Sequence, residues 1–421
     1  MNPPAPPKAS PPKASPPTAS PSTSPPTLTP PPTAANAAAL PSRSLRLLGA
    51  AGFVSNFDRF CIAPLLMLIS AQLGAPLSTV ALAAGGYALC YGLMQPVWGL
   101  LSDRLGRVRV MRLSLAGAAV AAFGSAAAPD VTTLIAARAV AGAFFAASIA
   151  ASLTYVGDTV LAGMRQRSLS GLMTAFALGT AVATAVAGAL ALRSGWRPVF
   201  ALPGLFAACL AVALRRLPEP EREPAGPLLA PLMTVLRSRW QWFVMGVAML
   251  EGAVLLGFLT YLAPALEAHG AKPDLAGAVS ALYGAGSIAA AQVVKRLAGR
   301  MGPVRLILVG GAQMVAGYLL AASGQSVPSL AVTALLLGGG WSFLHSTLQS
   351  WATGLTPSAR ATGVAMFGVA LYAGSALSGS LAAGAAEHHH YRLLFLTAAV
   401  LAVPLTAAAA VGRARYGPSA P

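Results

Sequence analysis

The chain has 421 residues, of which 56% are apolar and only 9% are charged, and its mean hydropathy is +0.67. A soluble domain carries about a quarter charged residues, so this composition excludes an ordinary soluble domain and predicts an integral membrane protein. The net charge of +17 does not indicate nucleic-acid binding, because its placement follows membrane topology, as shown below.

The N-terminal segment, residues 1–45, is rich in Pro, Ser, Ala and Thr, lacks an apolar core and carries few charges. This composition predicts a disordered cytoplasmic tail rather than a cleavable signal peptide. A polyproline site for a protein partner is the alternative for this segment.

Twelve apolar runs follow, each close to the roughly 20 residues that a helix needs to cross a hydrocarbon core of about 30 Å. They span residues 46–70, 78–101, 108–128, 131–156, 167–192, 197–214, 240–265, 275–295, 304–323, 328–352, 360–384 and 392–411. Twelve spans put both termini on one side of the membrane. With the termini in the cytoplasm, 22 of the 28 Lys and Arg are cytoplasmic, as the positive-inside rule requires. We therefore expect a multi-pass protein of the cytoplasmic (inner) membrane and no nucleic-acid partner.

An internal repeat divides these runs into two halves. Trp196 and Tyr391, each followed by Arg, are 195 residues apart, and Asp58 and Glu251 are 193 apart. This nearly constant offset predicts an all-α integral membrane fold of two pseudo-symmetric six-helix bundles. The expected parts are bundles at 46–216 and 240–411, a cytoplasmic linker at 217–239 and a cytoplasmic tail at 412–421.

The three cysteines, Cys61, Cys90 and Cys209, all lie inside apolar runs. Buried free cysteine behaves as a small apolar side chain, so we predict packing roles and neither disulfide nor metal site. No cofactor is expected.

The segment between the second and third runs, Gly99 to Arg109, reads Gly-Leu-Leu-Ser-Asp-Arg-Leu-Gly-Arg-Val-Arg. Glycine at such a turn allows close backbone approach and unusual dihedral angles. The segment resembles the second-to-third-helix loop of the major facilitator superfamily, Gly-x-Leu-x-Asp-Arg-x-Gly-Arg-x-Arg/Lys. The resemblance implies a secondary transporter that works by alternating access.

The same resemblance implies a cytoplasmic gate. Its expected members are Gly99, Asp103, Arg104, Gly106, Arg107, Asp158 and Arg360. Asp103 is expected against the start of the helix at 360–384, close to Arg360, where the positive end of the helix dipole favours an anion. Arg107 is expected to pair with Asp158. Ordinary surface ion pairs are the alternative. The second copy of the loop has Gly299 in place of Asp103, so the gate is expected to be one-sided.

Away from the ends of the apolar runs, four charged residues stand out: Asp58, Arg59, Arg138 and Glu251. Charges are costly in hydrocarbon and mark transport pathways or relays. Asp58 lies twelve residues into the first run, about 18 Å at 1.5 Å per residue, which is near the middle of the membrane. Glu251 has the matching depth in the seventh run. We therefore predict that both carboxylates carry protons.

Arg138 begins an Arg-x-x-x-Gly pattern that resembles a proton-transfer motif of the superfamily, with Ala141 where Gln is usual. A cation beside a titrating carboxylate can exchange partners during transport. The alternative for these charged residues is a permanent ion pair that holds helices together. Arg59 is about 100° around the helix from Asp58 and receives no role.

Mixed aromatic and amide side chains are expected to line a substrate cavity, which suits an amphipathic ligand. They are Asn56, Tyr87, Tyr91, Gln95, Tyr283, Gln292, Trp341, His345, Gln349 and Tyr372. His345 either titrates or is a hydrogen-bonded structural histidine.

In the fifth run, Gly179 to Gly188 keeps the spacing and two glycines of the antiporter pattern Gly-x-x-x-Gly-Pro-x-x-Gly-Gly, while Ala183, Thr184 and Ala187 replace its Gly, Pro and Gly. Together with Trp196-Arg197 at the start of the sixth run and Thr356-Pro357 before Arg360, the chain most resembles the twelve-helix drug:proton antiporters. The resemblance implies proton-coupled export of a small amphipathic compound, such as a drug, secreted metabolite or siderophore. A proton-coupled importer of a small metabolite is the main alternative.

Two further alternatives are a transport-inactive sensor and a membrane enzyme. The enzyme's site would be His388-His389-His390, but metal catalysis needs ligands from separated positions, so we predict no enzyme. The expected partners are a small-molecule substrate, protons and the lipid bilayer, and the protein is expected to be a monomer.

Overall fold

The computed structural model describes residues 42–220, 230–297 and 300–416. Most of the predicted N-terminal tail, part of the predicted linker, Gly299 and residues 417–421 lie outside this range. Within the described residues all regular structure is helical, and twelve helical segments are long and apolar enough to cross a membrane. The predicted fold class is confirmed.

The first half of the molecule contains six candidate spans. Its helices are α1 (Ser42–Phe60), α2 (Leu66–Leu73), α3 (Leu77–Leu105), α4 (Arg107–Ala127), α5 (Val131–Thr159), α6 (Ala162–Ser194) and α7 (Arg197–Ala213). The first span joins α1 and α2 through the short turn η1 (Ala63–Leu65). Helix α1 begins four residues before the predicted start at 46, and α3 continues four residues beyond the predicted end at 101.

The second half repeats this arrangement. Its helices are α8 (Ala230–Leu236), α9 (Arg239–Gly252), α10 (Leu262–Ala268), α11 (Pro273–Leu297), α12 (Pro303–Ser323), α13 (Val327–Gly340), α14 (Ser346–Leu355), α15 (Arg360–Glu387) and α16 (Tyr391–Arg415). Helix α8 falls inside the segment predicted to be a linker. Helix α16 continues past the predicted boundary at 411.

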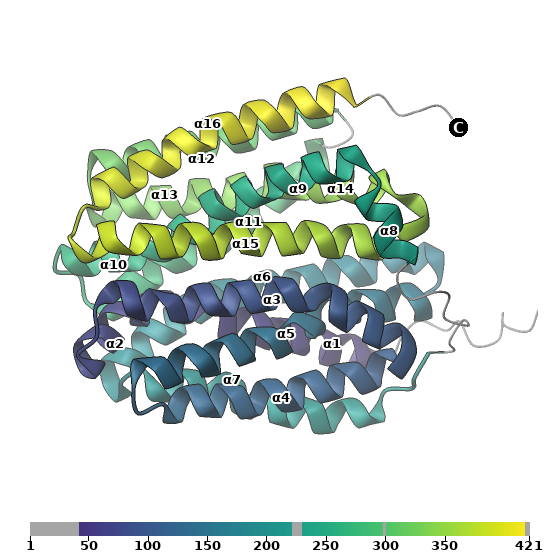
Figure 1. Ribbon diagram of the computed structural model, residues 1–421, viewed down its shortest axis with the longest axis horizontal. Helices are drawn as coiled ribbons and strands as arrows, with labels where there is room; N and C mark the ends of the chain where they lie inside the picture. The colour runs from purple at the N-terminus through teal and green to yellow at the C-terminus, as the bar shows by residue number, and fades with distance from the viewer. Residues whose placement is uncertain (1–41, 221–229, 298–299, 417–421) are drawn as a thin grey trace, which may run out of the picture. The chain divides into compact units, whose positions relative to one another are not determined.

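Helix pairing is the same in both halves, as the sequence repeat predicts. Helix α3 packs on α5 as α11 packs on α13, and α4 packs on α7 as α12 packs on α16. Likewise α1 packs on α6, and α9 packs on α15. The two halves meet along two long helix pairs, α3 with α15 and α6 with α11 (Figure 1).

Three spans are interrupted close to the buried charges. The first span breaks after Phe60, where Pro64 has no backbone N–H to donate to the preceding turn. The seventh contains a π-helical turn, η3 (Ala253–Gly257), followed by a 3₁₀ turn, η4 (Phe258–Tyr261). The tenth contains the π-helical turn η5 (Trp341–His345). Such π turns are frequent at functional sites.

Glycine allows the closest contacts between helices. A Cβ atom on Gly252 of α9 would lie 1.7 Å from the carbonyl oxygen of Leu371 of α15, and one on Gly374 would lie 1.8 Å from that of Met249. A Cβ atom on Gly246, also on α9, would meet nothing within 4 Å. Close backbone approach is therefore required at Gly252 and not at Gly246.

We expect Gly252→Ala to lower the free energy of unfolding by about 1–3 kcal/mol, because overpacking forces backbone shifts. Gly246→Ala is the matched control and should stabilise by up to about 1 kcal/mol, since alanine favours helix. Thermal unfolding of the detergent-solubilised protein measures both. Equal midpoints for the two variants would contradict the close α9–α15 contact.

Candidate functional site

Asp58 and Arg138 form an ion pair whose side chains are both 0% exposed. Arg138 Nη1 lies 2.9 Å from each carboxylate oxygen of Asp58, and Nη2 donates to the Asp58 carbonyl oxygen over 2.7 Å. The guanidinium also lies 4.5 Å from the ring centroid of Tyr87 and 4.7 Å from that of Phe200. This geometry joins α1 to α5 and neutralises both charges in the membrane interior.

Glu251 and His345 form the corresponding pair in the second half. His345 Nδ1 lies 3.1 Å from Glu251 Oε1, and the histidine ring stacks on Trp341 with 3.7 Å between ring centroids. Glu251 is completely buried, and its Oε2 has no hydrogen-bond partner among the described residues. The π-helical turn η5 ends at His345, so two of the three interrupted spans meet at this pair.

A small cavity of about 70 Å³ lies between the two halves. Its lining residues are Arg59, Phe60, Ile62, Ala63, Ala84, Tyr87, Ala88, Thr180, Thr184, Leu256, Leu259, Thr260, Ser280, Tyr283, Tyr372 and Ser375. Pockets for drug-sized ligands measure about 300–1,000 Å³. The halves are therefore closed around this cavity, and a larger ligand requires them to separate.

Tyr87, Tyr283 and Tyr372 are the predicted cavity residues that line this space. Tyr91 packs directly behind it, 4.8 Å from Tyr372 between ring centroids.

The other predicted cavity residues lie elsewhere. Asn56 donates to the Phe176 carbonyl oxygen over 2.8 Å, and Gln95 packs against Gly368. Both side chains therefore connect helices. Gln292 and Gln349 are exposed. Trp341 and His345 pack with Glu251, and these three residues are called the Glu251 cluster below.

Arg59 was missed as a site residue by the sequence analysis, and it lines the cavity. It donates a hydrogen bond to the Tyr372 hydroxyl, and its Cζ lies 4.6 Å from the ring centroid of Phe60 and 5.5 Å from that of Tyr91. The sequence held one signal for the position of Arg59. Adjacent residues point about 100° apart on a helix, so when Asp58 points into its own bundle, Arg59 points to a different side of α1.

Arg107 is the centre of the predicted gate. Its Nε lies 3.1 Å from Asp158 Oδ2, so the expected Arg107–Asp158 pair is present. Arg107 also pairs with Asp103 and donates to Ser102 Oγ over 3.1 Å.

Asp103 was expected to dock against the start of the helix at 360–384, close to Arg360. Among the described residues, the hydrogen bond and ion pair of Asp103 go to Arg107 and not to that helix start. Because α3 continues through Leu105, Asp103 lies four residues from Arg107, across the Gly106 turn, and pairs with it instead. The Asp103 side chain is 55% exposed, and Arg360 is also exposed. Arg104 lies in the last turn of α3.

Glu219, at the start of the linker, caps the first turn of α4. Its two carboxylate oxygens accept the backbone N–H groups of Val108 and Arg109 over 3.1 and 3.2 Å. An anion is favoured at a helix N-terminus by the helix dipole and the free N–H groups. The Tyr155 hydroxyl also donates to the Pro218 carbonyl oxygen over 2.9 Å. The linker is therefore attached to the gate segment, a contact that the sequence analysis missed.

The two glycines of the motif, Gly99 and Gly106, differ in backbone conformation and surroundings. Gly106 has φ +102° and ψ 149° at the turn between α3 and α4, a conformation almost confined to glycine. Gly99 lies inside α3, and a Cβ atom there would meet nothing within 4 Å. The expectation of close backbone approach at Gly99 is therefore wrong.

We expect Gly106→Ala to destabilise the α3–α4 turn by about 1–3 kcal/mol and to reduce transport. Gly99→Ala should leave both stability and transport close to wild type. Uptake assays at matched membrane expression measure the difference. Full transport by Gly106→Ala would show that the backbone conformation of Gly106 is not required for transport.

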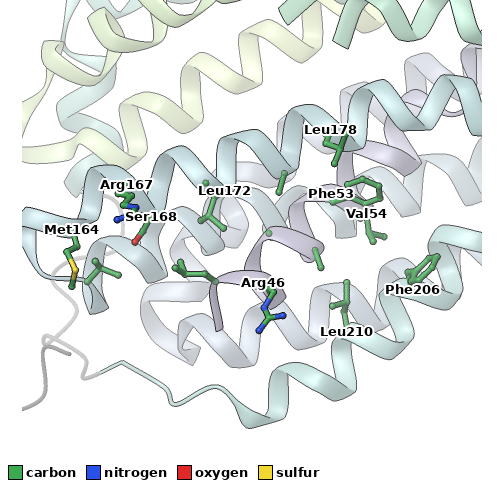
Figure 2. Close-up of a pocket in the computed structure, with 16 residues that line it drawn as sticks. Arg46, Phe53, Val54, Met164, Arg167, Ser168, Leu172, Leu178, Phe206 and Leu210 are labelled. Atoms are coloured by element: carbon green, nitrogen blue, oxygen red, sulfur yellow. The ribbon is translucent and has the colours of Figure 1, made fainter. Parts of the chain in front are cut away.

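A larger cavity of about 770 Å³ lies in the first half, lined by residues of α1, α6 and α7 and by Val160, which follows α5 (Figure 2). Its walls are mainly apolar and include Phe53, Leu172 and Phe206, together with Arg46 and Arg167. Asp58, Arg138 and Glu251 are not among its lining residues. These three residues do not line the smaller cavity either, but that cavity is lined by Arg59 and by Tyr87, whose ring lies against Arg138. The smaller cavity between the halves therefore has the stronger link to the buried charges.

The family model of the Major Facilitator Superfamily matches residues 48–270 and 242–420. The chain belongs to this superfamily. Membership places it among membrane transporters rather than enzymes, so the enzyme alternative at His388–His390 is set aside.

Several curated proteins are similar along most of their length. The multi-drug resistance efflux pump PmrA of Streptococcus pneumoniae is 25% identical over 362 residues, 82% of this chain and 90% of PmrA. The 3-(3-hydroxy-phenyl)propionate transporter of Escherichia coli K12 is 26% identical over 352 residues, 76% of this chain and 85% of that protein.

Solved structures support the fold. A bacterial homolog of the human lysosomal transporter Spinster, in an inward-facing and unoccupied conformation, has a TM-score of 0.72 at 17% identity and covers 91% of this chain and 100% of its own. A mutant of the nucleoside transporter NupG has a TM-score of 0.71 at 14% identity and covers 87% of this chain and 99% of its own.

Proposed function

We propose that this protein exports a small amphipathic compound in exchange for protons across the cytoplasmic membrane, with both termini in the cytoplasm. The observation that carries the proposal is the buried Asp58–Arg138 pair beside the cavity. Tyr87 links the two, because its side chain lines the cavity and its ring lies against Arg138. Proton exchange at the pair can therefore act on the groups around the cargo.

Asp58 is proposed as the principal proton carrier. A fully buried carboxylate is stable as an anion only while a cation neutralises it, and Arg138 does so here. When Asp58 binds a proton, Arg138 loses its ionic partner but keeps its hydrogen bond to the Asp58 carbonyl oxygen. The guanidinium is then free to change partners, which shifts the balance between conformations.

Glu251 is proposed as a second proton carrier. Its Oε1 contacts His345, whereas its buried Oε2 is a site at which a proton can bind. The Glu251 cluster includes the η5 turn, and η3 begins two residues after Glu251. A change of protonation there acts directly on interrupted segments of the second half.

The gate is proposed to lie at the cytoplasmic face, with Arg107 between Asp103 and Asp158. These ion pairs all lie within the first half, so we infer that they keep α3, α4 and α5 moving as one body. Contacts that join the halves lie at both ends of the bundle. Lys295 Nζ donates to Ser170 Oγ over 2.9 Å, and the Ser78 N–H donates to Glu387 over 3.3 Å. Alternating access requires one of these contacts to open at a time.

Similarity to PmrA, named as a multi-drug resistance efflux pump, supports export and an amphipathic cargo. The two bundles, 46–216 and 240–411, are proposed to be the moving bodies of a monomer.

Import of a small metabolite together with protons is the second candidate, and Arg59 favours it. Protonation of Asp58 would leave Arg138 and Arg59 as two uncompensated cations near the cavity, which strengthens the attraction for an anion. The E. coli relative, named as a transporter of 3-(3-hydroxy-phenyl)propionate, is consistent with this candidate.

Everted membrane vesicles containing the protein and energised to an acidic interior test the direction. A panel of anionic, neutral and cationic amphipathic compounds is added, and the interior pH is followed with a fluorescent dye. Exchange predicts that a transported compound causes protons to leave the vesicle as it enters. Movement of protons in the same direction as the compound would show symport and would contradict the proposed proton-coupled export.

A further inference from the structure

One cation in the membrane interior has no ionic partner among the described residues. Arg138 neutralises Asp58, and His345 contacts Glu251. Arg59 is in none of the ion pairs found among the described residues, and it donates a hydrogen bond to the hydroxyl of Tyr372. Its Nε is buried and has no hydrogen-bond partner in the described part of the chain. A desolvated guanidinium without an anion is costly.

The surroundings of Arg59 are aromatic. The Cζ atom lies 4.6, 5.3 and 5.5 Å from the ring centroids of Phe60, Tyr372 and Tyr91. Aromatic faces compensate part of the charge by cation–π attraction. They do not pair with the N–H donor of Nε, which is free to bind an anion, and a guanidinium favours a planar carboxylate.

Arg59 also lies at the junction of the two halves. It is on α1, and its hydrogen-bond partner Tyr372 is on α15. Tyr283, from α11, lies against the neighbouring Phe60, with 6.3 Å between ring centroids. A ligand bound to Arg59 therefore touches both moving bodies, as a cargo must.

We propose that Arg59 anchors a carboxylate of the cargo, and that the aromatic side chains around it hold an aromatic body. The cargo is then an amphipathic aryl carboxylate. The inference rests on the proposed function in taking this cavity as the cargo site, and it holds for either direction of transport. The present volume of about 70 Å³ admits the anionic group, and the body enters when the halves separate.

Three probes with the same aromatic body and different charge provide the test: 4-phenylbutyrate, 4-phenylbutyramide and 4-phenylbutylamine. Calorimetric titration of the purified full chain in detergent gives their dissociation constants. We expect the carboxylate to bind at least tenfold more tightly than the amide, since a charge-assisted hydrogen bond contributes more than a tenfold factor. The amine should bind most weakly.

Arg59→Gln should abolish this preference, and Arg59→Lys should keep part of it because the positive charge remains. Arg193→Gln is the matched control, since Arg193 is exposed and is not one of the residues that line the cavity. This variant should bind as wild type does. Thermal unfolding shows whether each variant is folded. Equal binding of the amide or amine, no binding of the carboxylate, or an unchanged preference in Arg59→Gln would overturn the proposal.

The binding assay uses no gradient, so it is independent of coupling and direction. Carboxylate binding through Arg59 without proton exchange in vesicles would contradict the proposed export alone. Proton exchange driven only by neutral or cationic compounds would support antiport and contradict the anionic cargo.

Discussion

Asp58→Asn is expected to abolish cargo accumulation driven by a pH gradient, because the amide cannot carry a proton between the two sides. The single variant also leaves Arg138 buried without an anion. Removing one partner of a buried ion pair costs about 3–5 kcal/mol, so lost transport alone would not separate coupling from misfolding.

The double variant Asp58→Asn/Arg138→Gln distinguishes loss of proton coupling from misfolding. Both side chains keep hydrogen-bonding groups, and no uncompensated charge remains at this pair. We expect it to unfold at a higher temperature than Asp58→Asn alone. It should exchange labelled cargo across liposomes at a rate within about tenfold of wild type, yet fail to accumulate cargo against a gradient. Gradient-driven accumulation by the double variant would remove Asp58 from the coupling mechanism.

Asp130→Asn provides the control for loss of a carboxylate. Asp130 is exposed and caps α5 by accepting the Thr133 backbone N–H over 2.8 Å. Hydrogen bonds from the backbone and hydroxyl of Thr133 hold the pKa of Asp130 below its usual range, so it is ionised at neutral pH. Asparagine caps helices about as well as aspartate, and this variant should therefore transport normally.

Glu251→Gln is expected to lower gradient-driven accumulation at least tenfold, while exchange of labelled cargo continues. Glutamine preserves the size of Glu251 and can still accept a hydrogen bond from His345, so the packing of η3 and η5 is retained. The two transport modes are compared in the same liposomes.

His345→Gln distinguishes a proton carrier from a structural pair. If Glu251 carries the proton, His345→Gln keeps gradient-driven accumulation, although the pH at which it is half-maximal changes. If the pair only holds α9 against η5, the two variants should be impaired equally in both transport modes. That result would leave Asp58 as the single carrier.

The sequence was sufficient for the main features of the fold. Apolar runs of membrane-spanning length predicted the twelve spans, because the bilayer imposes a length that composition reveals directly. The repeat offsets predicted the matching helix pairs. Asp58, Arg138 and Glu251 could be selected as candidate site residues from the sequence alone, because an ionisable residue deep in an apolar run is conspicuous whatever its partner.

The partners and the interruptions could not be predicted in the same way. A π-helical turn depends on local packing, and η3 and η5 have no proline that would mark them. Polar residues of one type also had different positions: Gln95 packs between helices, whereas Gln349 is exposed. Helical position alone does not decide between these outcomes, because neighbouring spans determine which face is covered. Arg59 was left without a role for the same reason.

The central claim is that proton movement and cargo movement are coupled at Asp58. The most direct measurement is the pH inside liposomes, followed with a trapped dye while cargo is added outside, for wild type and for Asp58→Asn/Arg138→Gln. The account predicts that protons leave as cargo enters through wild type, and that the double variant admits cargo without moving protons. Proton movement by the double variant equal to that of wild type, or none by wild type during cargo entry, would contradict it.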